Sequence, residues 1–160
     1  FHYVNAGKMF TGQMPASIAC TPKGIIRLLD EYKIKLEGLN ALVIGRSNIV
    51  GKPIAQLLLQ RNATVTMAHS KTKNLSEYTK MADLIVVAIG KPKFLNGDMV
   101  KDGVVIIDVG ISRVDGKLSG DVDFDSVAPK ASFITPVPKG VGPMTVAMLI
   151  QNTLELSKKH

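Results

Sequence analysis

Residues 42–53 read LVIGRSNIVGKP, an apolar run that breaks at a glycine and leads into a second glycine and a proline. A strand that ends in glycine and opens a helix offers backbone N–H groups to a phosphate, and the helix dipole favours an anion there. Gly45 would permit the tight turn, Ser47 would add a hydroxyl donor, and Gly51 would let the helix approach the sheet. The spacing departs from the fingerprint G-x-G-x-x-G, because position 47 is serine and the second glycine comes one residue late. Taken alone, the stretch predicts a phosphate site and a plain strand-to-helix turn about equally.

The stretch HSKTK (69–73) follows the next apolar run and carries no carboxylate. An NAD site places Asp or Glu about 20 residues beyond the first glycine, where it binds the ribose 2′-hydroxyl. Ser70, Lys71 and Lys73 stand there instead, and Arg46 follows the first glycine. A serine donor among fixed positive charges suits a 2′-phosphate. Each cation alone is also typical of a solvated surface; their convergence at two strand ends favours NADP over NAD.

The stretch TPVPKGVGPMT (135–145) interrupts an apolar strand just before a helix. Its three prolines and two glycines in eleven residues predict a stiff loop at the carboxyl end of a strand. Such a loop can hold a substrate or a nicotinamide ring. A merely rigid connection is the alternative, because proline stiffens a chain anywhere.

Groups that could move a proton are harder to find. The three histidines lie far apart and give no metal-ligand spacing, so no metal site is expected: His2, His69 and His160. Asp108 ends a predicted strand, and Asp121 and Asp123 follow a predicted hairpin; each could be a base, but capping and turn roles are commoner. No tyrosine is followed by a lysine four residues later. We therefore expect cofactor binding and no catalytic residue in this chain.

The composition restricts the class of protein. Hydrophobic residues make up 46% of the 160 and charged residues 21%, which is typical of a globular chain. The net charge of +7 favours an anionic partner, but the basic residues are scattered and aromatics make up only 5%. We therefore expect a phosphate-bearing cofactor and no nucleic acid. No apolar run approaches the roughly 20 residues that span a bilayer, so no membrane partner is expected. The single Cys20 and the lack of a secretory pattern favour a reducing compartment such as the cytoplasm.

Alternating helices and short apolar strands must position these residues. Strands are predicted at 40–45, 63–69, 83–90, 103–111 and 131–137, and helices at 21–33, 52–61, 74–82 and 143–159. Asp115 and Gly116 predict a hairpin turn within 113–120. Strands without polar alternation are buried on both faces, so the fold class is α/β, with a doubly wound, mostly parallel, Rossmann-like sheet and helices on both faces. Ligands bind beyond the carboxyl ends of such strands, where the three stretches above lie.

Six stretches occur in an order and spacing that resemble one known family: CTPKG, VIGRSNIVGKP, AHSKT, IDVGI, GDVDF and TPVPKGVGPMT. Together they are similar to the C-terminal NADP-binding domain of bifunctional methylenetetrahydrofolate dehydrogenase/methenyltetrahydrofolate cyclohydrolase, over nearly the whole chain. The resemblance implies oxidation of 5,10-methylenetetrahydrofolate with NADP+ and hydrolysis of 5,10-methenyltetrahydrofolate to 10-formyltetrahydrofolate. Both steps belong to one-carbon metabolism, which serves purine biosynthesis.

The resemblance also implies site residues. Six would contact the cofactor: Gly45, Arg46, Ser47, Ser70, Ile111 and Thr145. The first three would lie along the pyrophosphate and adenosine, Arg46 and Ser70 would reach the 2′-phosphate, and the last two would lie at the nicotinamide end. Five would line the wall of the folate cleft: Pro136, Pro138, Gly140, Gly142 and Pro143.

Two departures from the family pattern shape the expectation. The family has a domain ahead of this one with a Tyr-x-x-x-Lys pair, whose lysine acts in both reactions; neither is present here. Residues 1–160 are thus expected to be a single NADP-binding domain, with 1–20 the remnant of the connection to an N-terminal substrate domain that the chain requires for activity. The family also implies a homodimer. Lys139 stands where the family has glycine, which costs about 1 kcal/mol if that residue has positive φ.

Two alternatives stay open at this point. A non-catalytic NADP-binding or regulatory module would need the same phosphate turn but no substrate domain. A basic nucleic-acid binder is the weaker one, and it predicts steeply salt-dependent binding.

Overall fold

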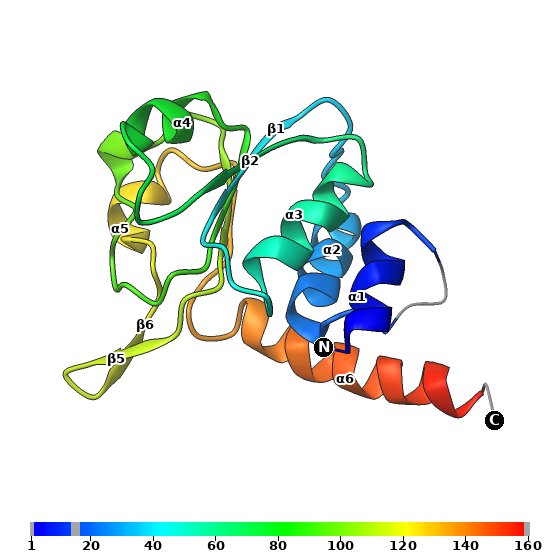
Figure 1. The fold of residues 1–160 in the computed structure, drawn as a ribbon. Helices are drawn as coiled ribbons and strands as arrows, with labels where there is room; N and C mark the ends of the chain where they lie inside the picture. Colours follow the sequence, from blue (N-terminus) through cyan, green and yellow to red (C-terminus); the bar gives the residue numbers. More distant parts are fainter. Residues whose placement is uncertain (1, 14–16, 159–160) are drawn as a thin grey trace.

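The structure, a computed structural model, describes residues 2–13 and 17–158 and is built around one parallel sheet (Figure 1). Five strands lie in the order β2-β1-β3-β4-β7, and every neighbouring pair is parallel. The strands are β1 (Asn40–Ile44), β2 (Thr64–Ala68), β3 (Leu84–Val87), β4 (Val105–Asp108) and β7 (Phe133–Ile134). The predicted doubly wound, mostly parallel sheet is confirmed.

Helices cover both faces of the sheet, as predicted (Figure 1). One face carries α2 (Cys20–Glu31), α3 (Gly51–Leu59) and the start of α6 (Val141–Ser157). The other carries α4 (Leu75–Met81), the 3₁₀ helix η1 (Gly97–Met99) and α5 (Phe124–Val127). Helix α1 (Tyr3–Phe10) lies against α3, where the Gln56 side-chain amide donates to the Phe10 carbonyl at 2.9 Å.

The core explains why the strands are apolar throughout. In β1, Ala41 and Val43 belong to the cluster under α2 and α3, while Leu42 and Ile44 belong to the cluster under α4 and α5. Successive side chains of a strand point to opposite faces, and both faces are covered here. A polar residue at any of these positions would therefore be buried, and β3 and β4 show the same division between the two clusters.

Element boundaries differ from the prediction where tertiary contacts decide them. The fifth strand shrinks from 131–137 to Phe133–Ile134, because the proline-rich loop begins directly after it. The first predicted helix begins at Cys20, and the last begins at Val141. Helices α1, η1 and α5 were not predicted: they have three to eight residues and bury at most one each, so they leave little apolar periodicity.

A short hairpin projects from the carboxyl side of the sheet (Figure 1). Strand β5 (Ser112–Val114) pairs antiparallel with β6 (Lys117–Ser119). Between them Asp115 and Gly116 have φ of 49° and 76°, the left-handed pair that a tight hairpin turn requires. The predicted Asp-Gly turn is confirmed.

The strand order places a crevice at a defined point. From β1 the chain first crosses to β2 on one side and then returns to β3 on the other, so the connections diverge between β1 and β3. In an open parallel sheet this is where ligands enter, beyond the carboxyl ends. None of the helices in the described ranges has the length and apolar character needed to cross a membrane.

Candidate functional site

The turn after β1 is tight because its first residue is glycine. Gly45 has φ of 122°, a conformation that side chains with a Cβ rarely adopt. A Cβ at Gly45 would also collide with the carbonyl oxygen of Ala88, beyond the end of the neighbouring strand β3. The backbone N–H of Gly45 donates to the Ala68 carbonyl at 2.9 Å, which joins the turn to the end of β2. Only glycine can therefore turn the chain here between two strands.

The same turn closes onto the start of α3. A Cβ on Gly51 would collide with the Gly45 carbonyl, so the helix approaches the turn at a distance that a side chain would prevent. The Ser47 hydroxyl oxygen accepts from the N–H groups of Val50 at 3.1 Å and Gly51 at 3.3 Å. Ser47 thus caps the start of α3, and its hydroxyl hydrogen is left to donate to a ligand.

The turn has the donors that a phosphate needs. Among the described residues, the backbone N–H groups of Arg46, Ser47 and Asn48 have no hydrogen-bond partner. They lie directly before a helix N-terminus, which favours an anion. A cradle between two glycines with free N–H groups fits the pyrophosphate of a dinucleotide.

The end of β2 lies next to this turn, because Ile44 and Ala68 are paired in the sheet. Beyond it the chain folds back on itself: the His69 N–H donates to the Thr72 hydroxyl at 2.9 Å, and the Lys71 N–H donates to His69 Nδ1 at 3.1 Å. His69 therefore has the turn-forming role that is common for a polar residue at a strand end. Ser70 and Lys71 are exposed, and no carboxylate occurs from 69 to 73.

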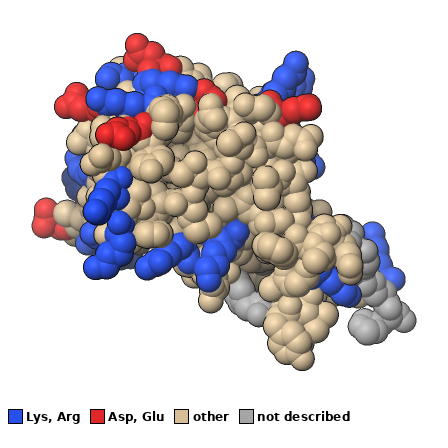
Figure 2. Space-filling model, turned by 45° about the horizontal axis from the view of Figure 1, so that its top comes forward, with Lys and Arg blue, Asp and Glu red and all other residues tan. Residues whose placement is uncertain are grey.

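The positive charge of the chain does not gather in one patch on the face that Figure 2 shows. On the face in Figure 2, Lys and Arg lie mostly around the rim, several of them along the lower edge, while the centre is largely uncharged. At the top of this view acidic side chains lie among the basic ones. Arg46 is exposed and has no ion-pair partner within the described part of the chain. Its guanidinium is free to bind a ligand phosphate.

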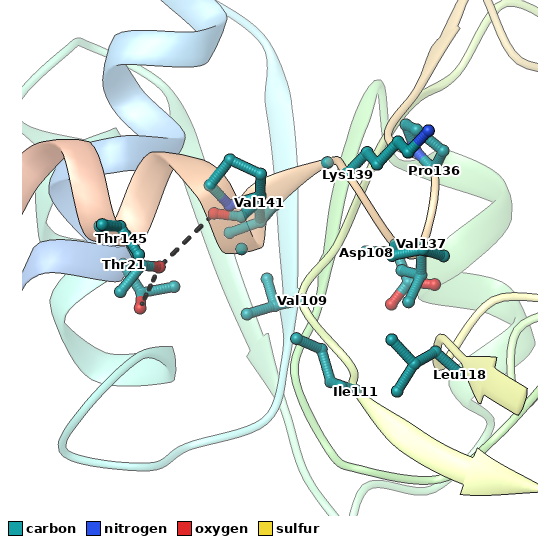
Figure 3. Close-up of a pocket in the computed structure, with 15 residues that line it drawn as sticks. Thr21, Asp108, Val109, Ile111, Leu118, Pro136, Val137, Lys139, Val141 and Thr145 are labelled. Carbon is teal, nitrogen blue, oxygen red and sulfur yellow. Dashed lines mark hydrogen bonds between the residues drawn. The ribbon is translucent and has the colours of Figure 1, made fainter. Parts of the chain in front are cut away.

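A second part of the site is a cavity of about 610 Å³ beyond β4 and β7 (Figure 3). All five residues predicted to line a folate cleft border it, as do Ile111 and Thr145. Thr21 at the start of α2 also lines it, and its hydroxyl is 2.9 Å from that of Thr145. In Figure 3 these two threonines lie on one side of the cavity, and Val137, Leu118 and Asp108 lie on the other. Apolar side chains predominate, so the cavity suits a flat ring better than a charged group.

The proline-rich loop forms one wall of the cavity, and its backbone conformation is constrained at two residues. Lys139 has φ of 80°, the left-handed conformation in which lysine costs about 1 kcal/mol relative to glycine. A Cβ on the next residue, Gly140, would collide with the Pro136 carbonyl. The loop is thus folded tightly on itself, as its composition predicted.

Two aspartates are buried on this side of the site: Asp108, at the end of β4, lines the cavity, and Asp121 follows the hairpin. Asp108 is 3% exposed and accepts three backbone N–H bonds, from Gly110, Asp121 and Val122, at 2.9–3.0 Å. Its own N–H donates to the Thr135 hydroxyl at 2.8 Å, which ties β4 to β7. Burial raises the pKa of Asp108 to about 6: loss of water outweighs the three N–H donors, and the nearby Asp121 also raises it. Only the bond from Gly110 to Asp108 is the local turn contact that was considered; the bonds from Asp121 and Val122 to Asp108, and from Ile89 and Gly90 to Asp121, join segments far apart in the chain.

The structure brings the predicted residues together in two groups. Gly45, Arg46, Ser47 and Ser70 come from the ends of β1 and β2, and Ile111 and Thr145 share the cavity with the five cleft residues. Their contacts with a ligand stay predictions. Sequence reasoning missed Thr21 and the pocket position of Asp108; the quoted stretches CTPKG and IDVGI contained both, but nothing local indicated their partners. In the described ranges no group of three His, Cys, Asp or Glu side chains could hold a metal ion, and His160 lies outside those ranges.

Comparison with known proteins identifies close relatives. Residues 19–160 match the family profile "Tetrahydrofolate dehydrogenase/cyclohydrolase, NAD(P)-binding domain". The bifunctional protein FolD of Campylobacter fetus is 64% identical over 161 residues, which is all of this chain and 56% of that protein. The chain thus spans little more than half the length of this relative.

Solved structures agree with the sequence comparison. The crystal structure of the bifunctional enzyme FolD, methylenetetrahydrofolate dehydrogenase/cyclohydrolase, from Campylobacter jejuni has a TM-score of 0.98 and 53% identity, covering 99% of this chain and 56% of that one. The Trypanosoma brucei N5,N10-methylenetetrahydrofolate dehydrogenase-cyclohydrolase, complexed with NADP cofactor and inhibitor, has a TM-score of 0.91 and 38% identity, covering 98% and 56%.

Proposed function

Because the chain belongs to the tetrahydrofolate dehydrogenase/cyclohydrolase family and matches its NAD(P)-binding domain, we propose that it is the NADP-binding part of a bifunctional enzyme. That enzyme oxidises 5,10-methylenetetrahydrofolate with NADP+ and hydrolyses 5,10-methenyltetrahydrofolate to 10-formyltetrahydrofolate. The chain covers 56% of such a relative, so the activity of the whole protein is part of the proposal.

The observation that carries the cofactor assignment is the pair of adjacent strand ends after β1 and β2. The first offers unpaired N–H groups at a helix start, and the second has Ser70 and Lys71 where an NAD site needs a carboxylate. Arg46 projects from the neighbouring turn. These groups favour a dinucleotide with a 2′-phosphate, because a charge-assisted hydrogen bond to phosphate is stronger than one to a free hydroxyl.

Bound NADP+ would supply the hydride acceptor. We place its pyrophosphate at Gly45–Ser47, its 2′-phosphate at Arg46 and Ser70, and its nicotinamide in the cavity beside Ile111 and Thr145. The apolar walls of the cavity would exclude water from the reacting ring. Pro136 and the following cleft residues would hold the folate on the opposite side. No residue of the chain forms the Tyr-x-x-x-Lys pair, so proton transfer in both reactions is assigned to residues outside it.

The remaining part of the enzyme needs a surface to contact. Helix α6 leaves four large apolar side chains 54–67% exposed: Val146, Leu149, Ile150 and Leu154. We propose that this helix packs against the substrate domain, that residues 1–160 form one cofactor domain, and that 1–20, which include α1, connect the two. Helix α1 buries none of its residues in this chain, as a connecting segment would.

A second copy of the chain is proposed at the open edge of β2. Within the described ranges this edge strand is paired only with β1, and an apolar hollow of about 830 Å³ lies between it, α1 and α3. Sedimentation equilibrium tests the homodimer: Val65→Lys, which puts a charge into the hollow, should convert a dimer to a monomer. A chain that is monomeric at every concentration would contradict the homodimer.

The proposal places the enzyme in the cytoplasm, in keeping with the free Cys20.

Isothermal titration of the chain with NADP+ and NAD+ tests the cofactor assignment. We expect NADP+ to bind at least about tenfold more tightly, and Arg46→Ala to remove most of that difference while leaving NAD+ affinity within about twofold. Arg27→Ala is the matched control, because Arg27 is exposed on α2 and forms an ion pair with Glu31. Equal affinities of the wild-type chain for both nucleotides would refute the assignment.

Turnover gives a separate test of the domain proposal. With NADP+ and 5,10-methylenetetrahydrofolate, the chain alone should form no NADPH, as followed by the absorbance of the reduced nicotinamide. Addition of a relative's N-terminal half should be required for activity. Turnover by the chain alone would show that a catalytic residue lies within it, and NADP+ binding without any complementation would favour the regulatory module.

A further inference from the structure

The hairpin β5–β6 is joined to the sheet at both of its ends by one carboxylate. Asp108 Oδ1 accepts from the N–H of Gly110 at 3.0 Å and from that of Asp121 at 2.9 Å. Asp108 Oδ2 accepts from the N–H of Val122 at 3.0 Å. Gly110 precedes the hairpin, and Asp121 and Val122 follow it. A single buried side chain therefore fixes where the chain leaves the sheet and where it returns.

A second carboxylate extends this connection to the neighbouring strand. Asp121 is fully buried, and its Oδ2 accepts from the N–H groups of Ile89 at 2.7 Å and Gly90 at 2.9 Å, just beyond β3. This strand end lies against the Gly45 turn, where a Cβ would collide with the Ala88 carbonyl. Asp121 thus links the hairpin to the part of the sheet edge that carries the turn after β1. We refer to this turn, residues 45–48, as the phosphate turn.

The two carboxylates are interlocked through two glycines. A Cβ on Gly110 would collide with the Asp121 carboxylate, and a Cβ on Gly120 would collide with the Asp108 carboxylate. Asp121 packs against Gly110, two residues after Asp108, and Asp108 packs against Gly120, directly before Asp121. This packing explains why glycine is needed at both positions, in the stretches IDVGI and SGDVD. We refer to Asp108, Gly110, Gly120 and Asp121 as the carboxylate clamp.

The hairpin itself has little else to hold it. From Ile111 to Ser119 no residue is buried, and Ile111 is 62% exposed. The returning end is also bound to residues 93–95, through the N–H groups of Lys93 and Leu95. For the outgoing end, the Asp108 carboxylate is the only partner of the Gly110 N–H among the described residues. Ile111 follows directly and lines the cavity, and Leu118 of β6 also lines it.

We propose that Asp108 and Asp121 are positioning residues, whose clamp sets the hairpin and the end of β3 so that Ile111 and Leu118 form a wall of the nicotinamide cavity. The link to nicotinamide rests on the proposed function; the link to the hairpin does not. The role proposed for both aspartates is an indirect one. The clamp acts through the backbone that it holds.

The distribution of the bonds over the oxygen atoms predicts an asymmetry between two similar substitutions. Both bonds to Asp121 end on Oδ2, and its Oδ1 has no partner among the described residues, so the amide of Asp121→Asn can keep both. The bonds to Asp108 use both oxygens, so Asp108→Asn must turn an NH₂ group toward a backbone N–H. Asp108→Asn should therefore open the clamp, Asp121→Ala should open it, and Asp121→Asn should leave it closed.

Limited trypsin digestion of the ligand-free chain measures the hairpin directly, because Arg113 and Lys117 lie exposed within it. We expect cleavage at these two sites to be at least about tenfold faster in Asp108→Asn and Asp121→Ala than in the wild type, and within about twofold in Asp121→Asn. Circular dichroism confirms that each variant is folded. Asp125→Asn, an exposed aspartate on α5, is the matched control and should cleave at the wild-type rate. Equal rates in all variants would overturn the clamp.

A measurement on the wild type keeps the proposal testable if Asp108→Asn does not fold. The clamp requires that the Gly110 N–H be protected from hydrogen exchange although it borders an exposed segment. Protection comparable to that of β4 supports the clamp, and exchange at the rate of the hairpin tip overturns it.

Titration with NADP+ then tests the link to the cavity. Asp108→Asn and Asp121→Ala should bind at least about tenfold more weakly than the wild type, with Asp121→Asn within about twofold. Faster hairpin cleavage with unchanged NADP+ affinity would overturn the positioning role. If the wild-type chain does not bind NADP+, the proposed function fails, while trypsin digestion and hydrogen exchange still decide the clamp.

Discussion

The charge of Asp108 should make the stability of this chain fall as the pH rises, and Asp108→Asn should remove that effect. Burial raises the pKa of Asp108 to about 6, from the ordinary value of 3.8. The folded state therefore holds the proton more tightly than the unfolded state. The stabilisation is fully present below pH 3.8 and is lost as the pH rises through about 6.

The size of the effect follows from the two values. At about 1.4 kcal/mol for each unit of pKa, ionising Asp108 costs about 3 kcal/mol of folding free energy, and about 2 kcal/mol of this falls between pH 4.5 and 7.5. Asp108→Asn is neutral throughout that range. It also loses the bond from Val122 and leaves two donors facing each other, which costs about 1–3 kcal/mol at every pH.

Urea denaturation followed by circular dichroism, at half-unit steps from pH 4.5 to 7.5, measures both parts. We expect Asp108→Asn to be less stable than the wild type at pH 4.5 and the gap to narrow by about 2 kcal/mol by pH 7.5. Asp83 and Asp123 have lowered pKa values, because Asp83 binds Lys101 and Asp123 binds Ser126, but both titrate in both proteins and cancel in the difference. Asp125→Asn should run parallel to the wild type. A constant gap between Asp108→Asn and the wild type would refute the reasoning.

Three further changes have defined outcomes. Ser47→Ala removes the acceptor for the Val50 and Gly51 N–H groups and should lower the free energy of unfolding by about 1 kcal/mol, measured by urea denaturation, with weaker NADP+ binding in the same preparation. Gly51→Ala places a Cβ against the Gly45 carbonyl and should cost about 1–3 kcal/mol and at least about tenfold in NADP+ affinity by calorimetry; unchanged affinity would contradict the close approach. Lys139→Gly relieves a positive φ and should raise stability by about 0.5–1 kcal/mol in thermal unfolding, and a lower melting temperature would contradict the strain.

Local patterns in the sequence were sufficient for the order of the five sheet strands and of the helices α2, α3, α4 and α6. The strands that became β1, β3 and β4 read as unbroken apolar runs, because both of their faces are covered. The Asp115–Gly116 turn was readable because the two left-handed residues adjoin in the chain. The length of β7 was not readable, since its apolar residues continue into a loop whose path depends on contacts with other elements.

The phosphate turn was predictable in its residues but not in how each one works. Ser47 was expected to donate to a phosphate; the structure shows that its oxygen also caps α3. Gly51 was expected to let the helix approach the sheet, and the atom that it must avoid is the Gly45 carbonyl. Both details involve residues at most six positions apart in the chain, so they depend on local geometry that the sequence pattern indicated only in part.

The sequence by itself determined the fold class and the strand-end stretches, and it is the basis of the proposed preference for a 2′-phosphate, because apolar periodicity, glycine and charge act locally. Only the tertiary structure decided which strand ends meet. The Asp108 carboxylate receives bonds from Gly110, two positions later, and from Asp121 and Val122, 13 and 14 positions later. The hydroxyls of Thr21 and Thr145 meet across 124 residues. Such bonds depend on the strand order β2-β1-β3-β4-β7, in which chain segments become neighbours that no local pattern connects. The carboxylate clamp therefore forms only in the folded chain, because no single stretch of the sequence contains all of its hydrogen-bond partners.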